Sequence, residues 1–332
     1  MLSPPAVPSP TAGVDPAPTA DPATVTRTEV VRPAMCGHNS LLLGRIGDWT
    51  WDAVAAVCDT DVLRAFDPSG APTYLSFYYY RVRGGRRFHL RTPSFGDRLH
   101  VTSRVFGFGS ESVLTLHRLA RTPAGERSPD PDDIRPIDPD EFYRAGDDGH
   151  LYVENFNRWI TRSDAASNEG LVRSSPIGFR HSHLPRLPDR YSPRLACHRA
   201  RTRLTFVDDE TQPSEPSGEP FTVDYPVDAS RDLNGVGLLY FATYFSIVDW
   251  ALLRFWQQLG GDVRSFLDRI VVDQQLCYLG NADAGTVVRV TVRRRSRDAS
   301  PDLNVIDVVL RDRASDRLLA VCTLQLLNGG HL

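Results

Sequence analysis

The stretch Asp232–Gly260, DLNGVGLLYFATYFSIVDWALLRFWQQLG, decides the fold of this protein. It begins as a polar, glycine-rich turn and continues as a long apolar segment that a Gly-Gly pair at 260–261 ends. Large apolar side chains recur at three- and four-residue spacing and share one broad helix face: Phe241, Tyr244, Phe245, Val248, Leu252, Phe255 and Leu259. A helix this apolar must be buried by other parts of the chain. Because most of the remaining chain is typical of strands, we expect a curved antiparallel sheet around it.

Composition narrows the classes of function. The net charge of -3 over 332 residues gives no general electrostatic case for binding nucleic acid or an anionic membrane. All 38 basic residues are arginine, so a lysine Schiff base or lysine general base is excluded. The five cysteines show no CxxC or CxxH spacing, which fits a reducing compartment. With no run long enough to span a membrane and no signal-peptide pattern, we expect a soluble, cytoplasmic protein.

The chain divides into a leader and two similar halves. Residues 1–30 are rich in Pro, Ala and Thr, and we expect them to be disordered. Residues 31–190 and 191–332 then repeat one order, in which a polar turn precedes a helix and a meander of strands. This order predicts two modules that arose by duplication.

Each half supplies its own turn, helix and strands. Met35–Cys58 holds the turn Gly37-His38-Asn39-Ser40 and a shorter helix that Asp48 or Thr50 caps. Residues 121–140 and 208–219 are predicted loops, and Leu151–Arg162 fits either a strand or a short helix. The predicted strands are Thr73–Val82, His89–Thr92, Arg98–Gly107, Ser112–Leu119, Arg199–Val207, Phe221–Val227, Ile270–Leu279, Val287–Arg295, Asn304–Arg311 and Leu318–Leu326.

The strand Thr73–Val82, TYLSFYYYRV, is unusually aromatic. Period-two geometry assigns its side chains to two faces. One face carries Tyr74, Ser76, Tyr78, Tyr80 and Val82, and the other carries Leu75, Phe77 and Tyr79.

The turn before the long helix resembles that of a known superfamily. Gly237–Phe245, GLLYFATYF, is similar to the turn and helix start of hot-dog acyl-CoA thioesterases, whose antiparallel sheet wraps one long helix. In those enzymes a carboxylate sits three residues before the glycine, whereas Asn234 stands here. Asn234 cannot act as a general base, which argues against ordinary hydrolysis, but it can donate a hydrogen bond to an oxyanion. The nearby Asp232 is two residues out of register.

A closer resemblance covers most of the chain beyond residue 30. Met35–Trp51, Pro72–Arg81 and Asn234–Ala242 resemble the double hot-dog acyltransferase/decarboxylase family of the leinamycin polyketide pathway. The resemblance implies an α+β double hot-dog fold in which an antiparallel sheet wraps two central helices. It also implies decarboxylation of methylmalonyl-CoA and transfer of the propionyl group to an acyl carrier protein. The acyl acceptor that it implies is a tyrosine.

The aromatic strand holds the candidate acceptors. Tyr74 and Tyr78 share a face and flank Ser76, so we expect one of these two to accept the acyl group, with Tyr79 as the second choice. A free phenol has a pKa of about 10 and needs activation by a cation or by a donor network. The other interpretation of these aromatic residues is that they fill the core and an interface.

Decarboxylation of a malonyl thioester leaves an enolate, which hydrogen-bond donors at a helix start would stabilise. The turns Gly37–Ser40 and Asn234–Gly237 are the candidates, and we expect Ser40, Gly235 and Gly237 to bind substrate there. His38 would protonate the enolate carbon or bind the thioester, and Asn39 would hold a carbonyl group. The alternative is that both turns only cap their helices.

Several arginines follow the aromatic strand. Arg81 and Arg83, with Arg86, Arg87 and Arg91, suit CoA phosphates or the acidic surface of a carrier protein. The alternative role of this cluster is a charged edge that resists sheet-to-sheet aggregation. We expect no metal and no cofactor, since CoA enters only as the thioester substrate.

Three functions compete. The first is the acyltransferase/decarboxylase, which we expect to form a homodimer because hot-dog modules commonly pair. The second is a hot-dog thioesterase or dehydratase, against which Asn234 and the absence of a His–Asp pair at dehydratase spacing argue. The third is a non-catalytic module that docks carrier proteins.

Overall fold

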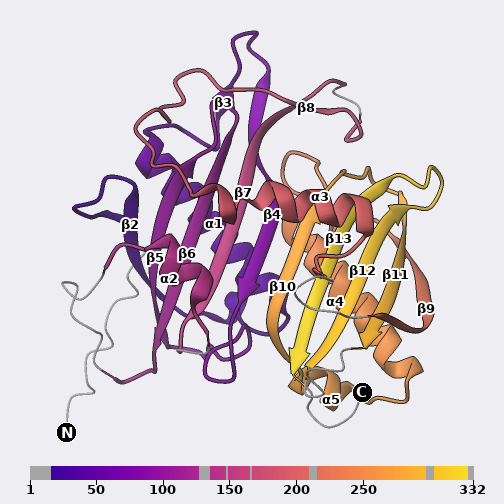
Figure 1. Cartoon of the computed structure of the whole chain (residues 1–332). Coiled ribbons are helices and arrows are strands. Elements are labelled where there is room, and N and C mark those ends of the chain that lie inside the picture. Colours follow the sequence, from indigo (N-terminus) through magenta and orange to yellow (C-terminus); the bar gives the residue numbers. More distant parts are fainter. Residues whose placement is uncertain are drawn as a thin grey trace, which may run out of the picture.

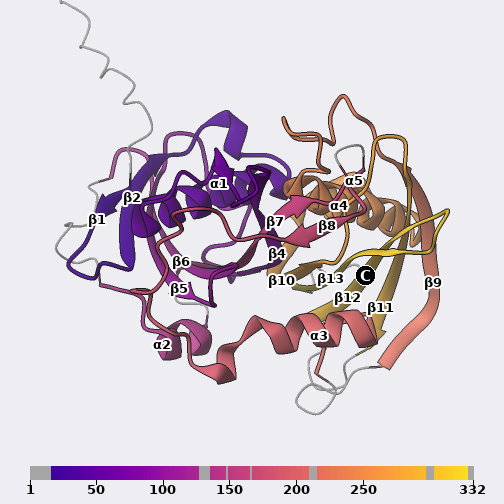
Figure 2. The same ribbon diagram turned by 90° about the horizontal axis from the view of Figure 1, so that it is seen from above.

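The computed structural model describes residues 16–126, 135–146, 149–164, 167–208, 215–296 and 303–327. Two long helices, α1 (Asn39–Cys58) and α4 (Phe241–Gln258), lie on one face of an extended antiparallel sheet (Figure 1). The short helix α2 (Pro139–Arg144) and α3 (Pro193–Arg203) cover the opposite face, as the view from above shows (Figure 2). This is the predicted α+β double hot-dog fold, with one sheet around two central helices.

The described residues contribute 13 strands to the sheet. Eleven of them follow one continuous order: β1 (Ala17–Pro18), β2 (Thr24–Val30), β5 (Arg98–Gly107), β6 (Ser112–Thr122), β7 (Leu151–Arg162), β4 (Pro72–Arg83), β10 (Ile270–Tyr278), β13 (Leu318–Leu327), β12 (Leu303–Asp312), β11 (Val287–Ser296) and β9 (Glu215–Pro226). The short strands β3 (Ala65–Phe66) and β8 (Leu171–Arg173) pair with β4 and β7. The two halves of the chain therefore meet where β4 pairs with β10.

The two central helices run antiparallel and touch through small residues. Ser40 of α1 accepts a hydrogen bond from Ser246 of α4 at 2.8 Å, whereas Gly47 lies against Phe241 at the start of α4. Buried apolar side chains of α4, of the first half of α1 and of the inner sheet face form the largest core cluster, while the second half of α1 packs in a smaller cluster with Leu75. A glycine at this crossing lets the Phe241 ring approach the α1 backbone, which fixes the position of the ring between the helices and the sheet.

The join between the halves is short. β4 pairs with β10 only from Tyr79 to Arg83, opposite Asp273–Cys277. Between Tyr74 and Tyr78, β4 pairs with β7 alone among the described strands. One edge of β4 is therefore open over this stretch.

A β-bulge interrupts β4 within the same stretch. Phe77 is opposite Asn157 and Tyr79 is opposite Phe156, so Tyr78 is the extra residue. Beyond the bulge the faces are exchanged: Tyr80 joins Phe77 in the inner core, while Tyr79 packs on the outer face. The prediction that Tyr80 and Val82 share the face of Tyr78 is therefore wrong, because the bulge adds one residue to the alternation.

Several predicted elements agree with the structure and some do not. The long helix and the strands from residue 270 onward are confirmed. Leu151–Arg162 is strand β7. The helix α1 begins at Asn39, so the expected cap at Asp48 or Thr50 is wrong, and the Thr50 hydroxyl instead donates to the Ile46 carbonyl group.

Three further assignments are corrected. The predicted strand Arg199–Val207 lies largely in helix α3, which has Pro193 in its first turn and ends at Leu204 with a left-handed backbone (φ 58°). His89–Thr92 is a turn closed by a backbone hydrogen bond between its end residues. Part of the expected leader is ordered, since Thr24–Val30 pairs with β5. Residues 1–15 of that leader lie outside the described residues.

The predicted loops need smaller corrections. The loop 121–140 ends where α2 begins at Pro139, and its residues 127–134 lie outside the described part of the chain. The loop 208–219 is shorter than predicted, because β9 begins at Glu215.

Candidate active site

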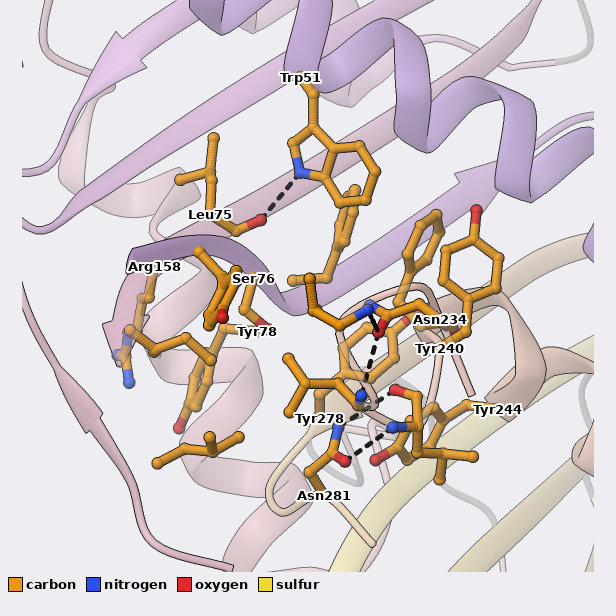
Figure 3. A pocket seen from close by; sticks show the side chains of 18 of the residues that line it. Trp51, Leu75, Ser76, Tyr78, Arg158, Asn234, Tyr240, Tyr244, Tyr278 and Asn281 are labelled. Carbon is orange, nitrogen blue, oxygen red and sulfur yellow. Dashed lines mark hydrogen bonds between the residues drawn. The ribbon is translucent and has the colours of Figure 1, made fainter. Parts of the chain in front are cut away.

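A cavity of about 580 Å³ opens at the seam between the two halves. The open edge of β4 forms one wall, and the turn before α4 together with the end of β10 forms the other. Figure 3 shows Ser76 and Tyr78 on the first side and Asn234, Tyr240 and Asn281 on the second. The cavity exists because β4 and β10 separate here instead of pairing.

Aromatic side chains form the apolar part of the cavity. The Phe77 and Phe241 ring centroids lie 4.2 Å apart, and Trp51 contacts both rings. The Trp51 indole N–H donates to the Leu75 carbonyl oxygen at 2.8 Å, which satisfies one acceptor beside the open edge (Figure 3). An apolar lining of this kind suits the acyl group of a thioester.

Tyr78 lies at the bulge and is held between two cations. The guanidinium carbon of Arg158 is 3.6 Å from the centroid of the Tyr78 ring. Arg201 of α3 donates to the Tyr78 hydroxyl at 3.5 Å. Burial raises the pKa of Tyr78, and the nearby thiols of Cys277 and Cys197 act in the same direction, while both arginines oppose them. The phenol is therefore protonated near neutral pH and has two positive groups ready to stabilise its anion.

Ser76 and Asn234 point polar atoms toward the cavity from opposite walls. The Ser76 hydroxyl has no hydrogen-bond partner among the described residues. The Asn234 side-chain oxygen accepts from the backbone N–H groups of Val236 and Leu238 at 3.1 and 3.0 Å. Its amide nitrogen has no partner in the described chain, so two donors are free to reach a bound oxygen atom.

The turn that carries Asn234 is braced from several sides. The Asn281 side chain accepts from the Leu239 N–H at 2.9 Å and donates to the Leu239 carbonyl at 3.1 Å. Asp232 is buried, and its two carboxylate oxygens share the proton of the Tyr225 hydroxyl at distances of 3.0 and 3.1 Å. Asp232 does not line the cavity. Asp232 therefore stabilises the shape of the turn, while Asn234 faces the cavity.

The structure brings together only part of the predicted set. Tyr74, Tyr78, Asn234 and Gly235 line the cavity. Gly237 has φ 76° and shapes the turn beside the cavity without lining it.

The other turn lies elsewhere. His38, Asn39 and Ser40 stand at the start of α1 and do not line the cavity, and the His38 ring is hydrogen-bonded to the Ser40 hydroxyl. The Asn39 amide nitrogen is buried without a partner among the described residues. Any catalytic role of this trio stays a prediction.

The predicted phosphate-binding arginines have partners within the fold. Arg81 forms a two-point contact with Asp273 across the β4–β10 join, with nitrogen–oxygen distances of 2.6 and 3.1 Å. Arg83 donates to the backbone carbonyl groups at the end of α2, including that of Phe142. Neither lines the cavity, and Tyr79 is buried with its hydroxyl donating to Gln275 at 3.0 Å.

Sequence reasoning missed several residues of the cavity. Arg158 on β7 lies opposite Ser76 in the sheet, and Arg201 comes from a segment predicted as a strand. Asp48 of α1 also lines the cavity, and burial raises the pKa of its carboxyl group. No periodic pattern joins these residues, since they meet only through strand pairing and helix docking.

Comparison with known protein families identifies the chain. The LnmK N-terminal Hot Dog Fold domain matches residues 26–208, which is more than half of the sequence. The chain belongs to this family. The LnmK family is the leinamycin family that the three sequence motifs resemble, so that resemblance is confirmed. No curated protein matches the chain by sequence.

Solved structures agree with the LnmK family on the fold. The 12:0-ACP thioesterase from Umbellularia californica has a TM-score of 0.55 and 12% identity, covering 92% of this chain and 94% of that one. A candidate oleoyl thioesterase from Lactobacillus plantarum has a TM-score of 0.57 and 12% identity, covering 93% and 98%. These full-length matches show a shared double hot-dog fold. None of the described helices is long and apolar enough to cross a membrane.

Proposed function

We propose that this protein decarboxylates methylmalonyl-CoA and transfers the resulting propionyl group to an acyl carrier protein, with Tyr78 as the transient acyl acceptor. Membership of the LnmK family supports the reaction class. The observation that carries the assignment of Tyr78 is its position at a β-bulge beside the cavity, between Arg158 and Arg201. Bulges occur next to active sites, where they redirect a side chain.

The first step breaks the bond between the α-carbon and the carboxylate of the substrate. Carbon dioxide leaves, and the electron pair moves into the thioester to form an enolate. The Ser76 hydroxyl and the Asn234 amide nitrogen are two free donors on opposite walls of the cavity, and they would bind the enolate oxygen. Protonation of the α-carbon from solvent or from a nearby acid then gives the propionyl thioester. Hydrogen bonds that strengthen as the enolate forms lower the barrier.

The second step forms an ester on Tyr78. The Tyr78 oxygen attacks the thioester carbonyl carbon while its proton passes to the departing sulfur, so that CoA leaves as the free thiol. The thiol of the carrier protein then attacks the ester and releases the tyrosine oxygen. Arg158 and Arg201 would stabilise that oxygen as an anion in both steps, which offsets the burial that raises its pKa. Tyr74 shares the cavity and would orient the acyl group, with Gly235 beside it.

Asp48 supports a second candidate function, thioester hydrolysis. It is the one carboxylate among the described residues that line the cavity, and its raised pKa suits a general base. Water activated by Asp48 would attack the same thioester carbonyl. Asp48→Asn would then abolish release of free acid and would leave acyl transfer intact.

Intact-protein mass spectrometry with methylmalonyl-CoA tests the proposal. We expect a propionyl-sized adduct that peptide mapping locates on Tyr78. Tyr78→Phe should form no adduct, whereas Tyr74→Phe, a matched change on the same strand face, should still form it. An adduct on another residue would refute the role of Tyr78. Methylmalonyl-CoA left intact, with and without carrier protein, would refute the decarboxylase.

A further inference from the structure

A second cavity, of about 680 Å³, lies on the other side of Tyr78. It shares Tyr78, Arg158, Arg173 and Arg201 with the first cavity. Arg194 and His198 of α3 line this second cavity and do not line the first. Tyr78 therefore stands where an apolar chamber meets a polar groove, and one long ligand can occupy both.

The polar groove is strongly cationic. Four of its lining residues are arginines, Arg158, Arg173, Arg194 and Arg201, which we call the arginine groove. The only carboxylate among its described lining residues is Glu111, whose oxygen is 3.9 Å from Arg173. The other three arginines have no carboxylate partner in the described chain. Four guanidinium groups against one carboxylate leave an excess of positive charge at this site.

Aromatic faces hold two of these arginines without using up their donors. Arg158 stacks on Tyr78, and its guanidinium carbon is also 5.3 Å from the Phe156 centroid. Arg194 of α3 lies 5.4 Å from the centroid of Phe108. Stacking fixes a guanidinium group in place while its N–H groups stay free for an oxyanion. Arg81 differs, because its guanidinium group already donates two hydrogen bonds to the Asp273 carboxylate.

We infer that the arginine groove holds the phosphopantetheine arm of a thioester substrate, with the phosphate beside Arg194 and Arg173 and the acyl end in the apolar chamber. This inference rests on the proposed function and assigns phosphate recognition to residues on β8 and α3, while Arg158 and Arg201 stay beside Tyr78. Arginine forks bind phosphate oxygens in pairs, and a groove with several unpaired forks suits a phosphorylated ligand. Tyr78 at the junction would then meet the thioester that links the two ends.

Isothermal titration calorimetry with fragments of the ligand tests this assignment. We expect pantetheine 4′-phosphate to bind about tenfold more tightly than pantetheine, because charge-assisted hydrogen bonds form only with the phosphate. Arg194→Gln and Arg173→Gln should each remove most of this advantage. Arg203→Gln is the matched control, since Arg203 is exposed on α3 but does not line the groove. Added salt should weaken the phosphate-dependent part alone.

Binding of adenosine 3′,5′-bisphosphate distinguishes the nucleotide phosphates of CoA from the phosphate of the pantetheine arm. If it binds and Arg194→Gln weakens it, the groove takes the nucleotide phosphates of CoA. If only pantetheine 4′-phosphate binds in an arginine-dependent way, the groove takes the phosphate that CoA and a carrier arm share. Equal binding of pantetheine with and without phosphate, or binding that Arg194→Gln leaves unchanged, overturns the inference.

Turnover separates this inference from the proposed function. Arg194→Gln should raise the KM for methylmalonyl-CoA about tenfold and leave the phosphate-free methylmalonyl-N-acetylcysteamine unaffected. Turnover of both substrates with no effect of Arg194→Gln overturns the groove alone. Arginine-dependent phosphate binding with no turnover of any thioester overturns the proposed function alone.

Discussion

Gly47 lies where the two central helices cross, and Gly47→Ala should destabilise the protein. A Cβ atom at this position would be 2.1 Å from the Phe241 Cζ atom and 2.8 and 3.0 Å from the neighbouring ring atoms. Carbon atoms pack at about 3.5–4.0 Å, so the ring must move by about 1.5 Å. Phe77, Trp51 and Tyr80 flank the ring, which also lines the cavity. We therefore expect it to move into the cavity.

Gly44→Ala is the matched control on the same helix. Its Cβ would be 3.4 Å from Ala242 and from the Tyr240 hydroxyl, which is close to ordinary contact. Replacing glycine by alanine inside a helix stabilises it by about 1 kcal/mol, and both variants share this gain. Overpacking at Gly47 costs about 1–3 kcal/mol. The difference in stability between the two variants should therefore equal the overpacking term alone.

Urea unfolding followed by circular dichroism would measure this difference. We expect Gly47→Ala to unfold with a free energy about 1–3 kcal/mol below that of Gly44→Ala. Gly47→Ala should also turn over methylmalonyl-CoA more slowly, because the displaced Phe241 ring narrows the cavity. Equal stability of the two variants would refute the reasoning, since the ring would then have moved without strain.

Three more predictions concern single polar groups. Burial raises the pKa of Glu154 to about 7, because the folded protein favours the neutral carboxyl group. The stability that depends on this neutral group is fully present below about pH 4 and is lost as the pH rises through 7. Glu154→Gln cannot ionise, and between pH 5 and 9 the wild type should lose on the order of 2–3 kcal/mol relative to this variant; a constant difference would contradict this. Tyr225→Phe removes the hydroxyl donor to the buried Asp232 and leaves the Asp228 N–H to donate to that carboxylate, so it should lower stability by about 1–3 kcal/mol in urea unfolding. An unchanged midpoint would mean that the turn does not need the Tyr225 hydroxyl. Ser76→Ala should lower kcat for decarboxylation by roughly 100-fold without changing stability. An unchanged kcat would show that the Ser76 hydroxyl does not stabilise the enolate.

The sequence determined the fold because its apolar pattern leaves few alternatives. The spacing within Phe241–Gln258 requires a helix that is buried along most of its length, and the following β-prone runs supply the sheet that covers it. The turn around Asn234 was also predictable, since its glycines and its asparagine favour a tight polar turn beside a helix start. These signals are local, so they can be recognised without knowing which residues lie nearby in the folded protein.

Tertiary structure alone decided which side chains form the cavity. The bulge at Tyr78 depends on the register between β4 and β7, which no single-strand pattern encodes. Arg158, Arg201 and Asp48 reach the cavity from three elements that only folding brings together. Arg81 looked equally suited to a phosphate in the sequence, but pairing of β4 with β10 places it against Asp273. Charge and residue type are local properties, whereas the partner of a charged group depends on long-range packing.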